Sequence, residues 1–137
     1  MVKQISVLIE TKPGQAYKPI KVLGEAGVDI CAVSIGDASD FGILRLIARD
    51  CDKAVNVLKA EGFTVNLTDL IGAVVQNEPG GLSSLLAVFE EEKISIEYFY
   101  SFISRKHEEA IMFFKVEEAS TALDKLKKHK VVLVETF

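Results

Sequence analysis

A turn motif that occurs twice in the chain limits the possible fold more than any other feature of the sequence. Lys12-Pro13-Gly14 recurs 66 residues later as Glu78-Pro79-Gly80. Further segments recur in the same order, the last with a slip of two residues: Val22-Leu23 as Val88-Phe89, Val28-Asp29-Ile30 as Ile94-Ser95-Ile96, and Gly42-Ile43-Leu44 as Ala110-Ile111-Met112. Repetition over this length indicates one structural unit present twice. We therefore predict two domains, residues 1–69 and 70–137, joined at Thr68-Asp69-Leu70 without a flexible linker.

Each copy shows the same succession of strand and helix patterns. Ile5, Val7 and Ile9 alternate with polar residues, which is typical of a half-buried strand. The second turn leads into an apolar stripe at helical spacing, formed by Leu82, Leu85, Leu86 and Phe89. The expected later strands are 28–36, 42–49 and 63–67, then 94–104, 110–116 and 131–135, with a second helix in each copy around Leu58 and Leu126. The order βαββαβ predicts the α+β class and a ferredoxin-like fold in two tandem copies, with antiparallel sheets and helices on one face of each.

The central strands are apolar on both faces. Val28 and Ile30 have one parity along the strand, whereas Cys31, Val33 and Ile35 have the other. Strands of this kind are covered on both sides, but the helices of this fold cover only one. We therefore expect another sheet, from the sister copy or from a second chain, over the remaining face, and we predict a homodimer.

Composition excludes several classes of partner. The net charge is −4 and the Lys and Arg residues are scattered, which argues against nucleic acid and against an anionic membrane surface. No apolar stretch is long enough to span a bilayer, and the first residues show no signal peptide. Cys31 and Cys51 indicate no disulfide framework. The sequence therefore predicts a cytoplasmic protein.

The chain lacks the residue groups that catalysis or metal binding requires. Neither His107 nor His129 has a cysteine, aspartate or second histidine at ligand spacing, and no nucleotide-binding glycine motif occurs. Asp52 is expected to cap the following helix or to lie in its first turn. We predict that the protein is not an enzyme and that it needs no metal or cofactor.

The repeated Pro-Gly turn is the strongest candidate for a binding site. It leads from a strand into a helix, where the first backbone N–H groups lack partners and the helix dipole is positive. Glycine allows close approach to the backbone, so a carboxylate suits this place. For a single copy, a purely structural turn is the simpler explanation. Asn77 and Asp29 lie near the same end of the unit, and each is either a ligand contact or a turn residue.

These segments resemble the ACT domain. The resemblance rests on Lys12-Pro13-Gly14-Gln15-Ala16 with Leu23-Gly24-Glu25-Ala26-Gly27-Val28-Asp29-Ile30, and on Asn77-Glu78-Pro79-Gly80-Gly81-Leu82 with Glu92-Lys93-Ile94-Ser95-Ile96. It covers essentially the whole chain. It implies two regulatory ACT domains that bind a small molecule, typically an amino acid, often between paired domains.

The resemblance also implies the site residues. In the family, the ligand lies between the turn after the first strand of one domain and the start of the second strand of a neighbour. The implied ligand-binding residues are Thr11, Lys12, Pro13, Gly14, Gln15, Ala16, Asp29 and Ile30 in the first copy, and Asn77, Glu78, Pro79, Gly80, Gly81, Leu82, Ser95 and Ile96 in the second. Backbone N–H groups after Gly14 or Gly80 are expected to hold a carboxylate, while Asp29 or Asn77 receives an ammonium group.

The two copies depart from the family pattern at different places. The differences, first copy against second, are Thr11 against Asn77 before the turn, Ala16 against Leu82 after it, and Gly27 against Lys93 before the second strand. We therefore expect two unequal sites. The best composite combines the turn 77–82 of the second copy with Asp29-Ile30 of the first.

Two functions from different classes follow from these patterns. The leading hypothesis is a regulatory protein that binds an amino acid and acts on an enzyme partner. The alternative is a protein–protein interaction or oligomerisation module without a metabolite ligand. An RNA-binding sheet with exposed aromatic residues is opposed by the acidic charge. A small enzyme on the same fold stays open, because a fold alone does not supply a function.

Overall fold

The computed structural model describes residues 1–36, 40–102 and 109–135, and the chain divides into two compact units. The N-terminal unit is Lys3–Thr68, and the C-terminal unit is Asp69–Phe137 together with Met1–Val2. The division falls inside a single strand, β4 (Val65–Gln76). Thr68, Asp69 and Leu70 are therefore strand residues, and the expected strand 63–67 continues without a break into the first strand of the second copy.

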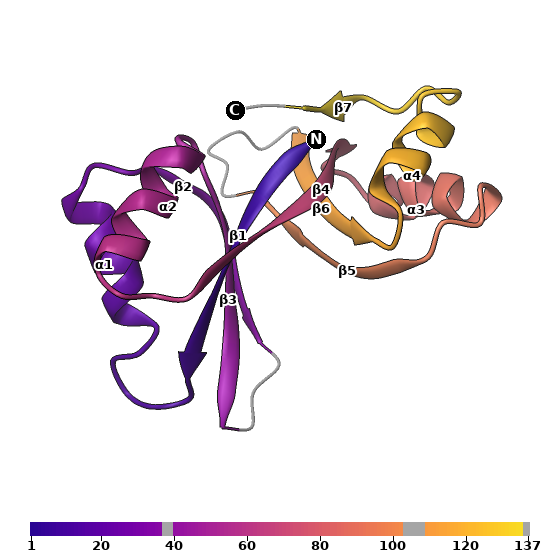
Figure 1. Cartoon of the computed structure of the whole chain (residues 1–137). Coiled ribbons are helices and arrows are strands. Elements are labelled where there is room, and N and C mark those ends of the chain that lie inside the picture. The colour runs from indigo at the N-terminus through magenta and orange to yellow at the C-terminus, as the bar shows by residue number, and fades with distance from the viewer. Residues whose placement is uncertain (37–39, 103–108, 136–137) are drawn as a thin grey trace. The chain divides into compact units, whose positions relative to one another are not determined.

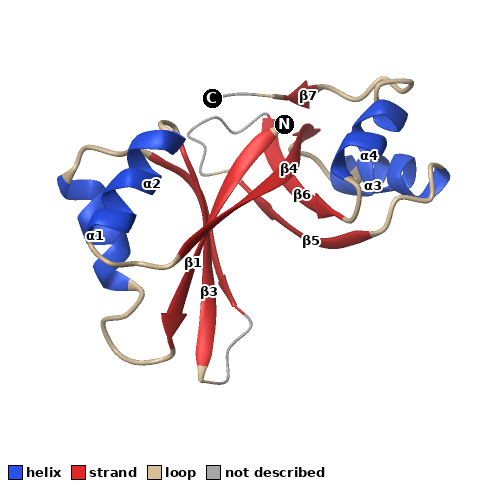
Figure 2. Ribbon diagram, viewed as in Figure 1, coloured by secondary structure: helices blue, strands red, loops and turns tan. Residues whose placement is uncertain are grey.

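The N-terminal unit is a sheet with two helices on one face (Figures 1 and 2). Its elements are β1 (Val2–Glu10), α1 (Tyr17–Glu25), β2 (Ile30–Gly36), β3 (Phe41–Ala48), α2 (Cys51–Ala60) and the beginning of β4. The strand order is β2-β3-β1-β4, and β3 is antiparallel to both of its neighbours. This is the ferredoxin-like arrangement that the sequence predicted.

The core of this unit lies between the helices and the sheet. Ile5, Val7 and Ile9, whose alternation predicted a strand, are all buried in it. Leu23 of α1 and Leu58 of α2 are fully buried in the same cluster. Burying one side chain of this kind contributes about 1.5–3 kcal/mol, so helix-on-sheet packing is a main source of the unit's stability.

The C-terminal unit repeats this architecture. Its elements are β4, α3 (Gly81–Glu91), β5 (Ile96–Ser101), β6 (Glu109–Val116), α4 (Ala119–Leu126) and β7 (Leu133–Val134), in the strand order β5-β6-β4-β7. The predicted helical stripe is confirmed, because Leu85 and Phe89 are buried while Leu82 and Leu86 pack against the same core. The ring centroids of Phe89 and Phe114 lie 4.6 Å apart at its centre.

The strand register confirms both the repeat and the slip of two residues. Ile5 lies opposite Leu46 in the N-terminal unit, and Ile71 lies opposite Phe114 in the C-terminal unit. The first members of these pairs are 66 residues apart (71 − 5), and the second members are 68 apart (114 − 46). The two additional residues therefore lie in the hairpin between β5 and β6, in agreement with the sequence alignment.

Three helices end in the same hydrogen-bonded turn. The residue after each C-cap has a positive φ: Gly27 at 75°, Gly62 at 87° and Lys93 at 55°. The next N–H then donates back to a carbonyl in the last helical turn: Val28 to Leu23 at 2.9 Å, Phe63 to Leu58 at 3.1 Å, and Ile94 to Phe89 at 2.9 Å. This is the Schellman motif. Lys93 therefore adopts the left-handed conformation that glycine adopts at the matching place of the first copy.

Some local predictions need correction. Asp52 lies in the first turn of α2, one of the two places expected for it, and the cap is Asp50, whose Oδ1 accepts a hydrogen bond from the N–H of Lys53 at 3.1 Å. β5 spans Ile96–Ser101, and residues 103 and 104 of the expected strand 94–104 lie outside the described residues; β7 is shorter than the expected 131–135. The cover over the sheet face opposite the helices stays a prediction.

Candidate functional site

Each Pro-Gly turn contains the same three backbone hydrogen bonds. They run from N–H to carbonyl oxygen: Lys12 to Glu10, Gln15 to Lys12 and Lys18 to Gly14 in the first copy, and Glu78 to Gln76, Gly81 to Glu78 and Ser84 to Gly80 in the second. Their lengths lie between 2.9 and 3.2 Å. The central glycines have nearly equal φ, 84° at Gly14 and 85° at Gly80. The left-handed conformation costs other residues about 1–2 kcal/mol, so both turns favour glycine.

The helices that follow the turns lack side-chain caps. Ala16 is the N-cap of α1 and Gly80 is the N-cap of α3. No side chain forms a capping hydrogen bond at either position. Among the described residues, the backbone N–H groups of Gly14 and Ala16 donate no hydrogen bond. They lie at the positive end of the α1 dipole, where a negative charge gains about 0.3–1 kcal/mol. The first turn thus has donors suited to a carboxylate.

A pocket of about 330 Å³ lies beside the first turn, entirely within the N-terminal unit. Four predicted residues line it, namely Thr11, Lys12, Pro13 and Ala16. Gly14 and Gln15 are not among its lining residues. The turn is therefore one wall of a cavity as well as a connection.

The remaining lining residues were not predicted from the sequence. They are Ile9 and Glu10 of β1, Ile35 of β2 and Gly42 of β3. Gly42 lies opposite Ile9 in the register of β1 with β3, and the order β2-β3-β1 brings Ile35 to the same end of the sheet. The alternation of residues along β2 indicates the sheet face on which Ile35 lies. That Ile35 lies close to the turn depends on the order of the strands in the sheet, which the alternation does not give.

The two charged residues of this pocket are paired with each other. The Nζ atom of Lys12 lies 2.8 Å from Oε2 of Glu10. This hydrogen-bonded pair lowers the pKa of the Glu10 carboxyl and raises the pKa of the Lys12 ammonium group. The other six lining residues carry no charge. The pocket is thus largely apolar, and its only two charged lining residues form an ion pair with each other.

The predicted strand-start residues of the first copy lie outside this pocket. The carboxylate of Asp29 pairs with Arg49, at 3.2 Å between Oδ2 and Nε. Ile30 packs against the core of the N-terminal unit. Within this unit the structure therefore does not bring Asp29 and Ile30 to the turn, and their pairing with the turn of the other copy stays a prediction.

A second cavity of about 330 Å³ lies beside the second turn, within the C-terminal unit. Two predicted residues, Glu78 and Gly81, line it, together with residues of β4 and α3 and the segment 130–132. Leu82 packs against the core instead. Asn77, Pro79 and Gly80 are exposed and are not among the lining residues. The two turns therefore adjoin pockets with different linings, and the unequal ligand sites stay a prediction.

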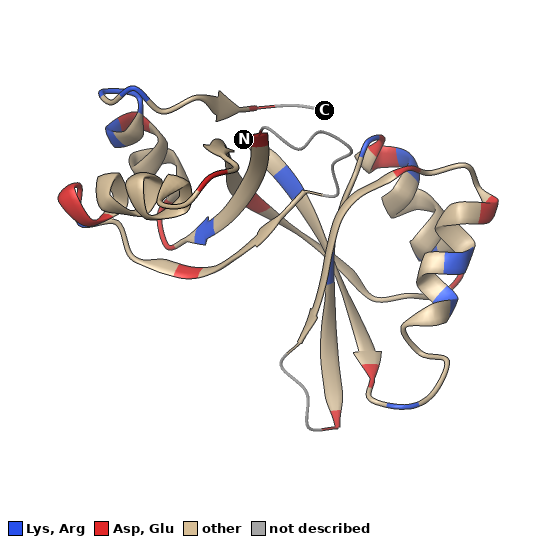
Figure 3. Ribbon diagram, turned by 180° about the vertical axis from the view of Figure 1, so that it is seen from behind, with Lys and Arg blue, Asp and Glu red and all other residues tan. Residues whose placement is uncertain are grey.

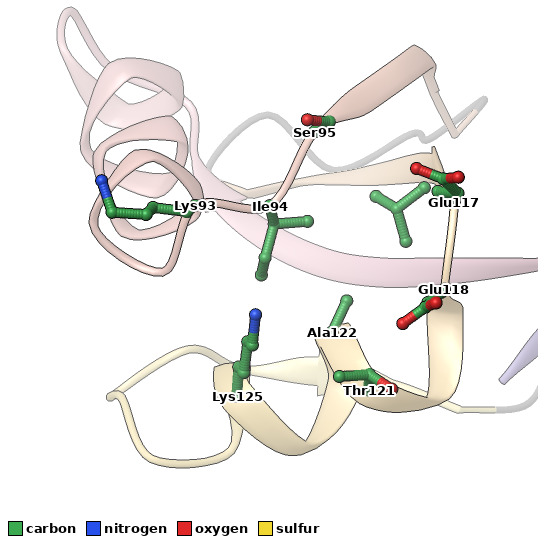
Figure 4. Close-up of a pocket in the computed structure, with 9 residues that line it drawn as sticks. Lys93, Ile94, Ser95, Glu117, Glu118, Thr121, Ala122 and Lys125 are labelled. Carbon is green, nitrogen blue, oxygen red and sulfur yellow. The ribbon is translucent and has the colours of Figure 1, made fainter.

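A smaller cavity of about 140 Å³ lies between the start of β5 and helix α4 (Figure 4). Ser95 lines it, together with Lys93, Ile94, Val116, Glu117, Glu118, Thr121, Ala122 and Lys125. The Nζ atom of Lys125 donates a 3.4 Å hydrogen bond to the carbonyl oxygen of Glu92. Ile96, predicted beside Ser95, packs against the core of the unit instead.

The described residues contain no candidate metal site. Within 1–36, 40–102 and 109–135, no set of three or more His, Cys, Asp or Glu residues could hold a metal ion. His129 Nε2 lies 3.5 Å from Glu92 Oε1, while His107 lies outside the described residues. Cys31 and Cys51 are free thiols, and burial raises the pKa of each.

The helices of each unit carry charged residues of both signs, although α3 carries only the acidic Glu90 and Glu91 (Figure 3). The basic residues Lys127, Lys128 and Lys130 follow the end of α4 in a turn. In the described part of the chain, every helix is too short or too polar to pass through a bilayer.

Comparison with known protein families identifies the family to which this chain belongs. A model described as the ACT domain pair matches residues 1–136. The chain belongs to this ACT domain pair family. ACT domain pairs are regulatory modules that typically bind small molecules such as amino acids. Among curated proteins, no sequence matches the chain.

Solved structures of ACT-containing and related proteins share the fold. Protein BT0572 from Bacteroides thetaiotaomicron is 35% identical, with a TM-score of 0.88, covering 97% of this chain and 91% of that one. The ligand-free regulatory subunit of aspartate kinase from Thermus thermophilus is 20% identical, with a TM-score of 0.65 and coverages of 92% and 90%. Aspartate kinase from Clostridium acetobutylicum is 14% identical, with a TM-score of 0.53, covering 93% of this chain and 32% of that one. The last two likenesses show the fold alone.

Proposed function

We propose that this ACT domain pair is a regulatory protein that binds an amino acid and has no catalytic activity of its own. Residues 1–69 and 70–137 form its two domains. The observation that carries the proposal is the first turn, which has donor groups at Gly14 and Ala16 and which lines a largely apolar pocket through residues that include Pro13 and Ala16. An amino acid needs both features, since its carboxylate requires donors and its side chain requires space.

The roles of the site residues follow from this arrangement. Backbone N–H groups at Gly14 and Ala16 hold the carboxylate, and Thr11, Lys12, Pro13 and Ala16 form the pocket wall beside it. Gly80 and its neighbours from Asn77 to Leu82 form the corresponding turn of the second domain. Asp29-Ile30 and Ser95-Ile96 complete the sites that the family pattern implies.

Thermal unfolding of the full chain, screened against the twenty amino acids, tests the function. We expect at least one amino acid to raise the midpoint of unfolding in a concentration-dependent manner, because a ligand that binds only the folded state stabilises it. A flat response to all twenty would contradict the proposal.

Paired substitutions at each turn separate charge from strain. Gly14→Asp places a carboxylate where the ligand's carboxylate is expected, whereas Gly14→Asn has the same shape without the charge. No other atom lies within 4 Å of a Cβ built on Gly14, so both variants suit the available space. We expect Gly14→Asp, or Gly80→Asp if the second site is used, to abolish the ligand-induced shift that the matching Asn variant retains. Gly62→Asp, with φ +87° and open space in α2's terminal turn, is the control for backbone strain.

A second candidate function is an interaction module without a metabolite. Leu8 and Phe41, at 51% and 55% exposure, lie on the face of the N-terminal sheet opposite the helices and favour this reading. A stoichiometric partner captured from the native cell, with no thermal shift by any amino acid, would select this function instead.

The proposal also includes the oligomeric state, the cellular location and the partners of the protein. We propose a homodimer in the cytoplasm, acting on an enzyme partner and contacting neither nucleic acid nor membrane. The free thiols Cys31 and Cys51 support a reducing setting, and the acidic net charge of −4 supports the absence of nucleic acid. Light scattering coupled to size exclusion tests the dimer, with the monomer mass of 15.0 kDa as reference.

A further inference from the structure

The pocket beside the first turn exists because small residues stand at two places. Ala16 is the last residue before α1, whereas at the matching place of the second copy Leu82 is the second residue of α3. Gly42 lies opposite Ile9, whereas its counterpart opposite Val75 is Ala110. The first copy therefore has less side-chain volume around its turn than the second copy.

The walls of this pocket are aliphatic. Ile9 from β1 and Ile35 from β2 lie on the helix-facing side of the sheet, and Pro13 and Ala16 come from the turn. Ile9 is 6% exposed and belongs to the core, but Ile35 is 56% exposed. An apolar group placed here would remove part of the Ile35 surface from water, and each buried methylene contributes about 0.8 kcal/mol.

The charges of the pocket are already compensated. Lys12 and Glu10 form an ion pair at 2.8 Å, so neither is left over to neutralise a charged ligand side chain. A charged side chain would have to replace one partner of this exposed pair or enter the aliphatic space without a partner, and desolvating an unpaired charge there is costly.

We infer that this pocket accepts an amino acid with an apolar side chain and discriminates against charged side chains. The inference rests on the proposed function, because it takes the carboxylate to be held by the turn. Ile9, Ile35 and Ala16 contact the side chain, and the absence of a side chain at Gly42 leaves room for it.

Calorimetric titration of the full chain tests the ligand class, with leucine, valine and phenylalanine compared against aspartate and lysine. We expect the best apolar amino acid to bind at least about tenfold more tightly than either charged one, which corresponds to about 1.4 kcal/mol. Aspartate or lysine binding as tightly as the apolar set would overturn the inference and leave the proposed function intact. If none of the twenty amino acids binds, both are overturned.

Substitutions locate the binding in this pocket. Ala16→Leu introduces the residue of the second copy, and Ile35→Thr keeps a β-branched side chain while making the wall polar. We expect each to weaken binding of the apolar amino acid by about tenfold or more, with little change in the unfolding midpoint without ligand. Val33→Thr is the matched control, because Val33 lies on the same face of β2, is 40% exposed and does not line the pocket. Unchanged affinity in both Ala16→Leu and Ile35→Thr would overturn the assignment.

Discussion

The carbonyl oxygen of Gln76 occupies the space that a β-carbon on Gly81 would need. Gly81 is the first residue of α3, and its own N–H is engaged with the carbonyl oxygen of Glu78 at 3.0 Å. The end of β4 and the start of α3 therefore approach each other so closely that only a residue without a side chain fits between them.

Gly81→Ala is expected to destabilise the protein by about 2–3 kcal/mol, because the backbone at Gln76 must move and overpacking has costs of this size. Urea unfolding of the purified variant measures the change. Gly24→Ala is the matched control, since Gly24 also lies in a helix but a Cβ built there meets nothing within 4 Å. That control should be neutral or should stabilise by about 0.5–1 kcal/mol. Equal effects of the two substitutions would contradict this explanation.

Lys93→Gly is expected to stabilise the C-terminal unit by about 1 kcal/mol, because Lys93 holds a left-handed conformation, φ 55°, that costs a residue with a side chain about 1–2 kcal/mol. The mirror experiment is Gly27→Ala, which should destabilise by a similar amount. Chemical denaturation of both variants gives the comparison. Loss of stability in Lys93→Gly would show that the lysine side chain contributes more than the strain removes.

Asp50→Ala is expected to cost about 1 kcal/mol of unfolding free energy, because the Asp50 carboxylate accepts the capping hydrogen bond from the N–H of Lys53. Asp52→Ala should cost less, about 0.3–1 kcal/mol, since Asp52 contributes through the helix dipole in the first turn. Thermal melts of the two variants under one buffer decide the order. A larger loss of stability for Asp52→Ala than for Asp50→Ala would contradict the assignment of Asp50 as the capping residue.

Lys12→Met is expected to raise the pKa of Glu10 back toward its ordinary value, because the hydrogen bond and charge of Lys12 lower it in the folded protein. NMR titration of the Glu10 carboxyl carbon measures the shift. Since the folded-state pKa is the lower one, the pair stabilises the fold above the unfolded-state pKa, and this contribution disappears as the pH falls through the folded-state pKa. Both side chains are exposed, so added salt should weaken the effect. An unchanged Glu10 pKa in Lys12→Met would contradict the pairing.

Local features of the chain predicted most of the fold. The alternation of Ile5, Val7 and Ile9 and the stripe ending at Phe89 both reflect regular periods of strand and helix, which any single segment displays. The positive φ values at Gly14 and Gly80 follow from residue type in the same way. The repeat at an offset of 66 residues then required one architecture to account for both halves.

The sequence by itself therefore determined the repeated ferredoxin-like unit, the glycine turns and the helix that each turn begins, because periodicity and backbone preference are properties of neighbouring residues. Only the tertiary structure decided that Ile35 and Gly42 meet the first turn at a pocket, and that Asp29 is paired with Arg49. These contacts depend on strand order, register and side-chain direction, which join residues far apart in the chain and leave no periodic trace in it.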